Sequence, residues 1–382
     1  MPVVYLLVII FFLSLNMRPS ITSVGPVLDI IIKDLSMSGV SASLITTLPV
    51  LCMGIFALLA IKLSNRLGIE KSLIFAMLLI FIATIMRAFT NSSPTLILTA
   101  LVSGIGIGVS GPLISGFIKK YFPHRLSVTS IYSVSMVIGA SLATTFSIPL
   151  YKRFNDSWQL SLSFWSILAL LAAILLIPLL IQKKPQKPVM AMPKLKINNI
   201  RIYLFMTLFG CMASVFYAIT AWLAPIAQNM GMSYADSGYV LTLFTIVQIP
   251  VSLAMPFLVE KVATRKFWLL FSGLAEFIGV IILLFGFSPW LAAISIGIGA
   301  GGLFPLALLL PIQESANTNE ATSWSAMMQA GGFTFGAIGP ILFGLTVDLS
   351  DSFKPALLVL AFILCVLFIT VYKIEAKPHT TN

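Results

Sequence analysis

Arg18 is the residue whose type and position point most directly to chemistry. It lies about fifteen residues into the apolar segment from Val3 to Val24, which is long enough to span a bilayer. An arginine at the centre of a membrane helix costs roughly 3 kcal/mol on insertion scales, so such a residue usually faces a protein interior or a watery cavity and marks a ligand path. The sequence therefore predicts an anion-binding site inside a membrane protein.

The residues around Arg18 could complete this site. Ser14, Arg18 and Thr22 are four apart and would form one polar stripe on a continuous helix. Pro19 follows directly, and the residue before a proline is biased away from helical geometry, so we expect a kink that frees backbone carbonyls. The alternative is that Arg18 is structural and bonds to those carbonyls or to another helix.

Only one carboxylate, that of Glu276, lies deep within an apolar segment. A bound anionic substrate is therefore the natural counter-ion of Arg18, because the planar fork of arginine suits a small carboxylate-like or nitro group. Glu276 itself has three interpretations that the sequence leaves open. It could couple transport to protons, remain a neutral buried acid, or lie at the lipid edge.

Four further side chains in apolar segments are candidate substrate contacts, namely Tyr217, Trp222, Gln248 and Gln329. Aromatic and amide groups suit a small planar ligand, and each could equally belong to the packing between helices.

The sequence shows no signature of an enzyme. Its two histidines, His124 and His379, fall in a loop and in the C-terminal tail, so no histidine base lies at depth. There is no metal-ligand cluster, nucleotide-binding loop or nucleophile beside a base, so we expect no catalytic residue, no metal and no cofactor. A membrane enzyme and a receptor without turnover are the rival classes, and a flux measurement separates a receptor from a carrier.

The elements that must position these residues are apolar helices. Hydrophobic residues make up 59% of the chain and charged residues 9%, with a mean hydropathy of +1.04, which excludes an ordinary soluble domain. Short polar breaks divide the 382 residues into segments of about twenty apolar residues. We expect twelve membrane spans: 3–25, 41–61, 72–89, 94–117, 127–150, 158–181, 202–224, 237–259, 267–287, 289–311, 322–347 and 355–372.

Basic residues gather on one side of these spans, as is typical of cytoplasmic loops. Examples are Lys62 and Arg66 after the second span and Lys183, Lys184 and Lys187 in the longest gap. We therefore expect both termini in the cytoplasm, and the net charge of +11 reflects this topology rather than binding to nucleic acid. The N-terminus has no basic region of a signal peptide, so we expect the first span to be retained.

An internal repeat indicates how the spans are organised. A glycine pattern in the fourth span recurs in the tenth at one constant offset: Gly104, Gly106, Gly108 and Pro112, then Gly297, Gly299, Gly301 and Pro305. We infer two related six-helix halves, 1–181 and 202–382, joined by a basic linker, 182–201. Parallel repeats of this size are typical of major facilitator transporters, whose substrate site lies near the midplane between the halves.

Two glycine pairs, Gly104 with Gly108 and Gly297 with Gly301, are each four apart on one helix face. Such pairs let two helix backbones approach closely. They could serve plain packing, or they could provide smooth faces for the movements of alternating access.

The segment Lys62–Lys71 resembles the cytoplasmic loop of the major facilitator superfamily, with its Asp-Arg-x-Gly-Arg-Lys pattern. Arg66 and Gly68 fit that pattern, whereas Asn65 stands where an aspartate is usual. The resemblance implies a gating role for Arg66 and Gly68, and a simple positively charged turn is the alternative.

A closer resemblance comes from the runs 16–26 (NMRPSITSVGP), 44–54 (LITTLPVLCMG) and 328–333 (MQAGGF). These runs are similar to the cyanate and nitroimidazole transporter family of bacteria. The resemblance implies an all-α secondary transporter of the bacterial inner membrane that moves a small anion or a small planar heteroaromatic solute by alternating access. It also implies a peripheral ninth span, so that a direct pair between Arg18 and Glu276 is not expected. We expect coupling to protons and a monomer in the lipid bilayer.

Overall fold

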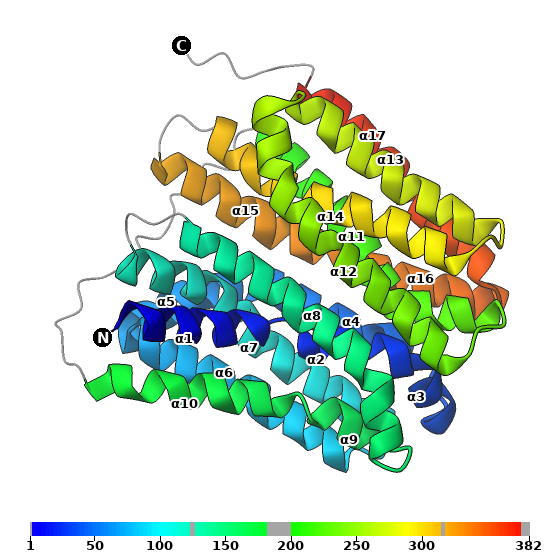
Figure 1. Cartoon of the computed structure of the whole chain (residues 1–382), viewed down its shortest axis with the longest axis horizontal. Coiled ribbons are helices and arrows are strands. Elements are labelled where there is room, and N and C mark those ends of the chain that lie inside the picture. Colours follow the sequence, from blue (N-terminus) through cyan, green and yellow to red (C-terminus); the bar gives the residue numbers. More distant parts are fainter. Residues whose placement is uncertain (1, 123–126, 182–199, 315–317, 376–382) are drawn as a thin grey trace. The chain divides into compact units, whose positions relative to one another are not determined.

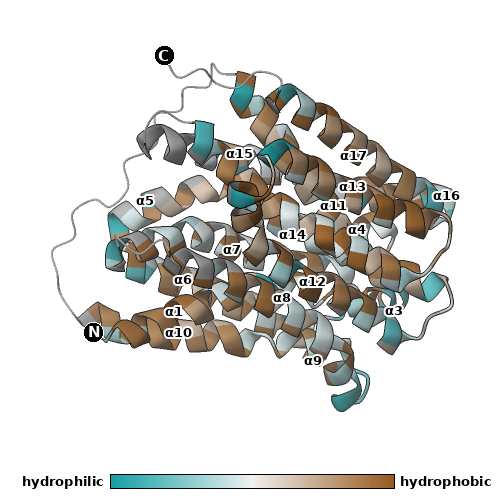
Figure 2. Ribbon diagram, turned by 45° about the horizontal axis from the view of Figure 1, so that its top comes forward, coloured by the Kyte–Doolittle hydropathy of each residue, from teal (hydrophilic) through white to brown (hydrophobic). Residues whose placement is uncertain are grey.

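Helices make up most of the residues that the computed structural model describes, which are 2–122, 127–181, 200–314 and 318–375. Within them, eleven helical segments are long and apolar enough to cross a membrane, and the helix Gly39–Ile55 is a shorter apolar one. Figure 2 shows the apolar colouring along these helices. The predicted class, an all-α membrane protein, is confirmed.

The helices pack into two compact units. Unit 1 comprises Met1–Met37 and Leu44–Met192, and unit 2 comprises Ser38–Ser43 and Pro193–Asn382. Most of the predicted linker, 182–199, lies outside the described residues, so the linker stays a prediction.

Unit 1 carries the first half of the helices. In chain order they are α1 (Val3–Leu15), α2 (Pro19–Thr22), η1 (Gly25–Val27), α3 (Leu28–Asp34), α4 (Gly39–Ile55), α5 (Ala57–Leu67), α6 (Ile69–Met86), η2 (Arg87–Phe89), α7 (Ser93–Tyr121), α8 (Ser127–Arg153), α9 (Trp158–Ser163) and α10 (Ser166–Ile181). Helix α6 packs against α7 and α10, and α1 packs against α8 and α10 (Figure 1).

Unit 2 contains seven described helices: α11 (Ile200–Asn229), α12 (Tyr234–Lys261), α13 (Arg265–Leu284), α14 (Pro289–Glu314), α15 (Thr318–Gly336), α16 (Ile338–Ser350) and α17 (Phe353–Glu375). Helix α13 packs against α14 and α17, while α14 also packs against α12. The first turn of α4 belongs to this unit as well, because the Asp348 carboxylate accepts hydrogen bonds from the backbone N–H groups of Gly39 and Val40. A carboxylate at a helix N-terminus satisfies donors that have no partner within the helix.

The glycine repeat makes equivalent contacts in the two units. In unit 1, a Cβ at Gly108 would lie 2.4 Å from the carbonyl oxygen of Cys52 in α4. In unit 2, a Cβ at Gly301 would lie 2.9 Å from the Cα of Gln248 in α12. Both helix pairs therefore meet backbone to backbone, which only a residue without a side chain permits.

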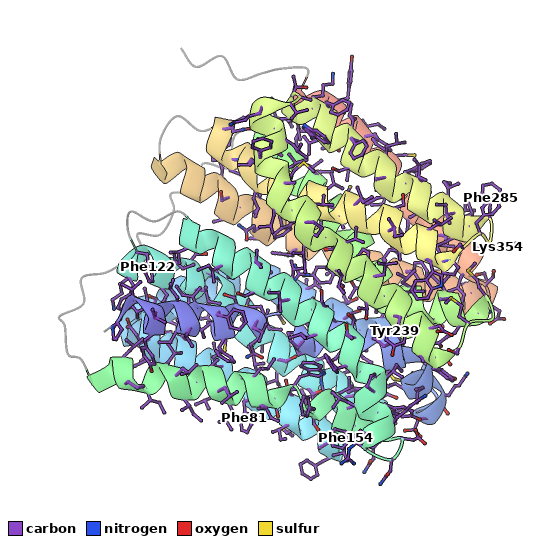
Figure 3. The ribbon with its side chains drawn as sticks, in the orientation of Figure 1. Phe81, Phe122, Phe154, Tyr239, Phe285 and Lys354 are labelled. Atoms are coloured by element: carbon purple, nitrogen blue, oxygen red, sulfur yellow. The ribbon has the colours of Figure 1, made fainter. Side chains whose placement is uncertain are left out.

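Large apolar side chains also cover the outside of each unit. Phe89 of unit 1 is 80% exposed and Phe285 of unit 2 is 69% exposed, and Phe285 projects outward in Figure 3. Side chains of this kind are typical of a surface that faces lipid rather than water.

Candidate functional site

The first membrane span is broken at the residue that the sequence singled out. Helix α1 ends at Leu15 and α2 begins at Pro19, so the predicted span 3–25 is interrupted near Pro19, where the sequence led us to expect a kink. Arg18 lies at the start of α2 with φ −115° and ψ −34°. Proline lacks an N–H group and restricts the residue before it, which accounts for a break at this point.

The break changes the predicted stripe of Ser14, Arg18 and Thr22. Arg18 and Thr22 share one turn, because the Arg18 carbonyl accepts from the Thr22 N–H at 3.0 Å and from its hydroxyl at 3.2 Å. Ser14 belongs to the preceding helix, where its hydroxyl bonds to the Ile10 carbonyl at 2.6 Å. The three residues therefore do not lie on one continuous helix, although all three are buried in unit 1, with Arg18 only 9% exposed.

Helix α8 supports the two ends of the break. A Cβ at Gly139 would lie 2.1 Å from the Leu15 carbonyl oxygen, so α8 touches the last turn of α1 closely. The Ser147 hydroxyl donates to the Ser23 carbonyl at 2.9 Å. Backbone carbonyls that a broken helix leaves without an internal partner need such donors in an apolar surrounding.

A second arginine, Arg87, hydrogen-bonds to the backbone of α2, just after the break. Its Nη1 donates to the Ser20 carbonyl at 2.8 Å and its Nε to the Thr99 hydroxyl at 3.3 Å, and its side chain is fully buried. No carboxylate pairs with it among the described residues. Sequence reasoning does not identify this residue, because an arginine directly after an apolar segment is typical of a charge at the membrane boundary. A lone arginine directly after an apolar run was the only signal available.

The other candidate substrate contacts lie in unit 2, and each already has a packing environment there. The Trp222 indole N–H donates to the Ser43 hydroxyl at 3.3 Å, and the ring stacks on Phe343 at 5.5 Å. Tyr217 is buried beside Phe216, and the Gln248 amide donates to the Phe244 carbonyl of its own helix at 2.9 Å. Gln329 is half-buried on α15. Their contact with a substrate stays a prediction.

Glu276 lies on α13 and is completely buried. Neither of its carboxylate oxygens has a hydrogen-bond partner among the described residues, and neither has the hydroxyl of Ser272, one turn earlier on the same helix. Because Glu276 is fully covered by protein, the interpretation as a residue at the lipid edge is wrong.

The predicted gating loop joins α5 to α6. Arg66 is exposed, and Gly68 has φ 83°, a backbone conformation that favours glycine at this turn. Close by in sequence, the Glu70 carboxylate accepts from Lys120 at 2.6 Å and from the Tyr121 hydroxyl at 2.7 Å. Burial, together with the hydrogen bond to Glu70, raises the pKa of the Tyr121 phenol. The gating role of Arg66 and Gly68 stays a prediction.

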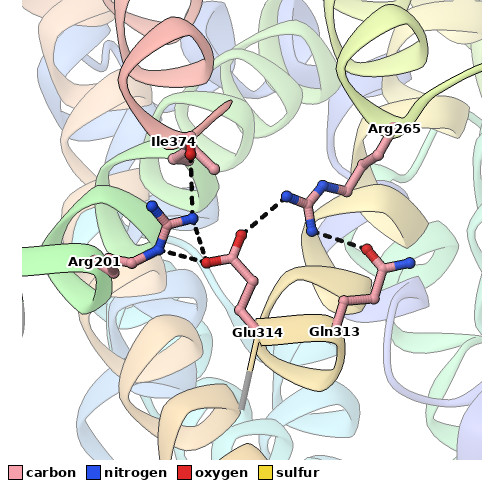
Figure 4. Close-up of polar contacts among 5 residues, drawn as sticks. All are labelled: Arg201, Arg265, Gln313, Glu314 and Ile374. Carbon is pink, nitrogen blue, oxygen red and sulfur yellow. Dashed lines mark hydrogen bonds and ion pairs between the residues drawn. The ribbon is translucent and has the colours of Figure 1, made fainter. Parts of the chain in front are cut away.

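The equivalent helix pair of unit 2, α13 and α14, is also joined by an ion pair, but the acidic and basic residues are exchanged between the two helices (Figure 4). Glu314 at the end of α14 pairs with Arg265 at the start of α13, at 2.9 Å, and also with Arg201 at the start of α11. Arg201 donates to the Ile374 carbonyl at 3.1 Å as well. The acid is thus on the first helix of the pair in unit 1 and on the second helix in unit 2.

Comparison with known proteins agrees with this architecture. The Major Facilitator Superfamily model matches residues 4–337 and, again, 204–382. The solved D-xylose-proton symporter superposes with a TM-score of 0.79 at 15% sequence identity, over 100% of both chains. At that identity the likeness concerns the fold alone.

Three relatives are similar over most of their length. The uncharacterized transporter YycB of Bacillus subtilis (strain 168) is 33% identical, over 92% of this chain and 89% of the relative. The cyanate transport protein CynX of Escherichia coli (strain K12) is 30% identical, over 91% of each chain. The 2-nitroimidazole transporter of the same organism is 28% identical, over 93% of this chain and 91% of the relative. The chain therefore belongs to the major facilitator superfamily, in the family that includes the cyanate and nitroimidazole transporters.

Proposed function

We propose that this protein is a secondary carrier of the bacterial inner membrane, which moves a small anion or a small planar heteroaromatic solute by alternating access. The observation that carries the proposal is Arg18, a guanidinium buried in unit 1 at the break between α1 and α2. A buried guanidinium suits a small, planar, negatively polarised ligand, because its fork donates two parallel hydrogen bonds. Relatives named for cyanate and 2-nitroimidazole support this substrate class.

Thr22 adds a hydroxyl in the same helical turn as Arg18, and Ser14 adds one in the preceding helix. We keep Tyr217, Trp222, Gln248 and Gln329 as proposed contacts that contribute aromatic and amide surface to a planar solute. Each is tested by its alanine variant in the flux assay described next.

The test is flux of radiolabelled cyanate and of 2-nitroimidazole into proteoliposomes that contain the purified protein. We expect Arg18→Lys to lose most of this flux while the protein folds normally, because an ammonium keeps the charge but not the bidentate fork. Arg153→Lys makes the same change at an exposed position at the end of α8 and should leave the flux unchanged. Near-normal flux in Arg18→Lys would exclude Arg18 as the ligand-binding group.

The same assay separates a carrier from a receptor. Saturable binding of either solute without flux would support the receptor alternative, and chemical conversion of the solute would support the membrane enzyme. We further propose that the protein works as a monomer. We also propose that a proton gradient drives accumulation, because the fully buried carboxylic acid of Glu276 is a group able to carry a proton.

A further inference from the structure

The two units place different side chains at one equivalent position. In unit 1, Gly106 of α7 packs against α6, and a Cβ there would lie 2.8 Å from the Ala76 carbonyl oxygen and 2.7 Å from an Ile80 side-chain carbon. Its repeat partner in unit 2, Gly299 of α14, packs against α13 in the same way. A Cβ there would lie 2.5 Å from the Ser272 carbonyl oxygen and 2.3 Å from a Glu276 side-chain carbon. Ala76 and Ile80 thus correspond to Ser272 and Glu276.

The residues of unit 1 show that an apolar pair is sufficient to pack against the glycine at this position. Ala76 and Ile80 are both buried, so an apolar pair fills the position in unit 1. In unit 2 a hydroxyl and a carboxylic acid stand at the same contact with a glycine. Buried polar groups without partners are costly, so the polar pair needs a reason other than packing.

Among the described residues, neither member of the polar pair has a hydrogen-bond partner. Ser272 and Glu276 are each 0% exposed, and neither the hydroxyl nor the two carboxylate oxygens has a hydrogen-bond partner among the described residues. A Cβ at Gly302 would lie 2.2 Å from the Ser272 hydroxyl oxygen, so α14 covers this group as closely as it covers Glu276.

Among the described residues of α13, α14 and α17, no charged side chain pairs with Glu276. Helix α14 has one charged residue, Glu314, at its last position, where it pairs with Arg201 and Arg265. On α17 the charged residues are confined to the two ends, and Cys365, in its middle, is exposed. The basic residues of α13 itself, Arg265 and Lys266, occupy its first turn. An ionised carboxylate in this position has no counter-charge, whereas one bound proton makes it neutral.

We infer that Ser272 and Glu276 form a buried proton-binding site in unit 2, and this inference rests on the proposed function as a carrier. The proton forms an O–H bond with one carboxylate oxygen of Glu276, and nothing is oxidised or reduced. The Ser272 hydroxyl is both a donor and an acceptor, and it lies one turn nearer to the Arg265 end of α13 than Glu276 does. A metal cation of the calcium type needs six to eight oxygen ligands, and this pair supplies three from its side chains.

The equivalent residues of unit 1, Ala76 and Ile80, define the substitutions of the test variant. The double variant Ser272→Ala/Glu276→Ile gives unit 2 the residues that already fill the equivalent space in unit 1, so we expect it to fold. In proteoliposomes we expect counterflow exchange of radiolabelled cyanate to persist, while accumulation driven by an imposed pH gradient falls at least tenfold toward the level without a gradient. Glu276→Gln, which keeps the shape but holds no exchangeable acid proton, should behave alike. Ser295→Ala removes another hydroxyl from the same helix pair, one bonded to the Ala275 carbonyl, and should leave accumulation unchanged.

A second measurement needs no substrate. Unfolding returns Glu276 to water, where a glutamic acid ionises above about pH 4.3. The native wild type should therefore release about one more proton on unfolding than the double variant, so that its Tm falls relative to that of the variant as the pH rises from 5 to 8.

The outcomes separate the two proposals. If the wild type does not transport cyanate or 2-nitroimidazole, the proposed function fails, and the Tm comparison still decides whether Glu276 retains a proton. A constant Tm difference across this pH range, or undiminished gradient-driven accumulation in the double variant, would overturn the proton site.

Discussion

At the scale of single residues, unit 1 contains two buried arginines close to one helix break. Arg18 begins α2, and the Nη1 of Arg87 bonds to the carbonyl of Ser20, two residues further along. Two buried arginines in one unit favour a negatively charged or negatively polarised ligand over a cationic one. Because Arg87 contacts the backbone of α2 at the Ser20 carbonyl, we propose that it is a positioning residue for the site.

We expect Arg87→Lys to lower kcat/KM for cyanate transport by roughly tenfold, the equivalent of one lost charge-assisted hydrogen bond. A single ammonium keeps the charge but does not reproduce the fork that reaches both the Ser20 carbonyl and the Thr99 hydroxyl. Initial rates in proteoliposomes over a range of cyanate concentrations provide the measurement. Thr99→Val removes the weaker of the two contacts and should lower kcat/KM by less than about threefold. Equal losses in both variants would show that the bond to Ser20 is not what positions the site.

At the scale of elements, glycines set the distance between helices. Gly108 brings α7 onto α4 and Gly301 brings α14 onto α12, in each case against backbone atoms that have little freedom to move. Helices in a membrane gain stability from such close approach, because lipid chains are as apolar as the side chains they would replace. Gly111, one turn from Gly108, has only ordinary contacts, the nearest being the terminal carbon of Met17 at 3.7 Å.

We expect Gly108→Ala to lower the free energy of unfolding by roughly 1–3 kcal/mol, the usual cost of overpacking, because its Cβ would collide with the Cys52 carbonyl. Gly111→Ala is the matched control on the same helix. It should be neutral or slightly stabilising, since alanine is the better helix former by about 0.5–1 kcal/mol. Thermal unfolding of the purified proteins in detergent compares the two, and similar Tm values for both variants would contradict the close contact.

At the scale of the whole molecule, the two units repeat one packing scheme with different charges. The ion pair between the start of one helix and the end of the next is Glu70 with Lys120 in unit 1, and Arg265 with Glu314 in unit 2. The exchange of acid and base keeps an attractive pair in each unit. The surrounding basic residues make this the side that we propose to be cytoplasmic.

This topology predicts that both termini face the cytoplasm. A cysteine introduced as Thr380→Cys, with Cys52, Cys211 and Cys365 replaced by alanine, should resist a membrane-impermeant maleimide in intact cells and react with it after lysis. A separate variant, Lys354→Cys in the same cysteine-free background, tests the opposite side of the membrane. Lys354 is exposed at the start of α17, so this cysteine should react in intact cells. Labelling of the Thr380 position before lysis would reverse the proposed orientation.

The sequence by itself determined the membrane class, the repeated helices and the importance of Arg18, because hydropathy, repetition and a charge in an apolar span are properties of local sequence. It also indicated a kink at Pro19, although not that α1 ends as early as Leu15. Only the tertiary structure decided what surrounds each polar group. It showed that Arg87 donates a hydrogen bond to the Ser20 carbonyl and that the Trp222 indole donates one to the Ser43 hydroxyl. It also enclosed Glu276 at a position where unit 1 has Ile80. These features depend on contacts between residues far apart in the chain, and the spacing of residues along one helix does not report which neighbouring helix will cover them.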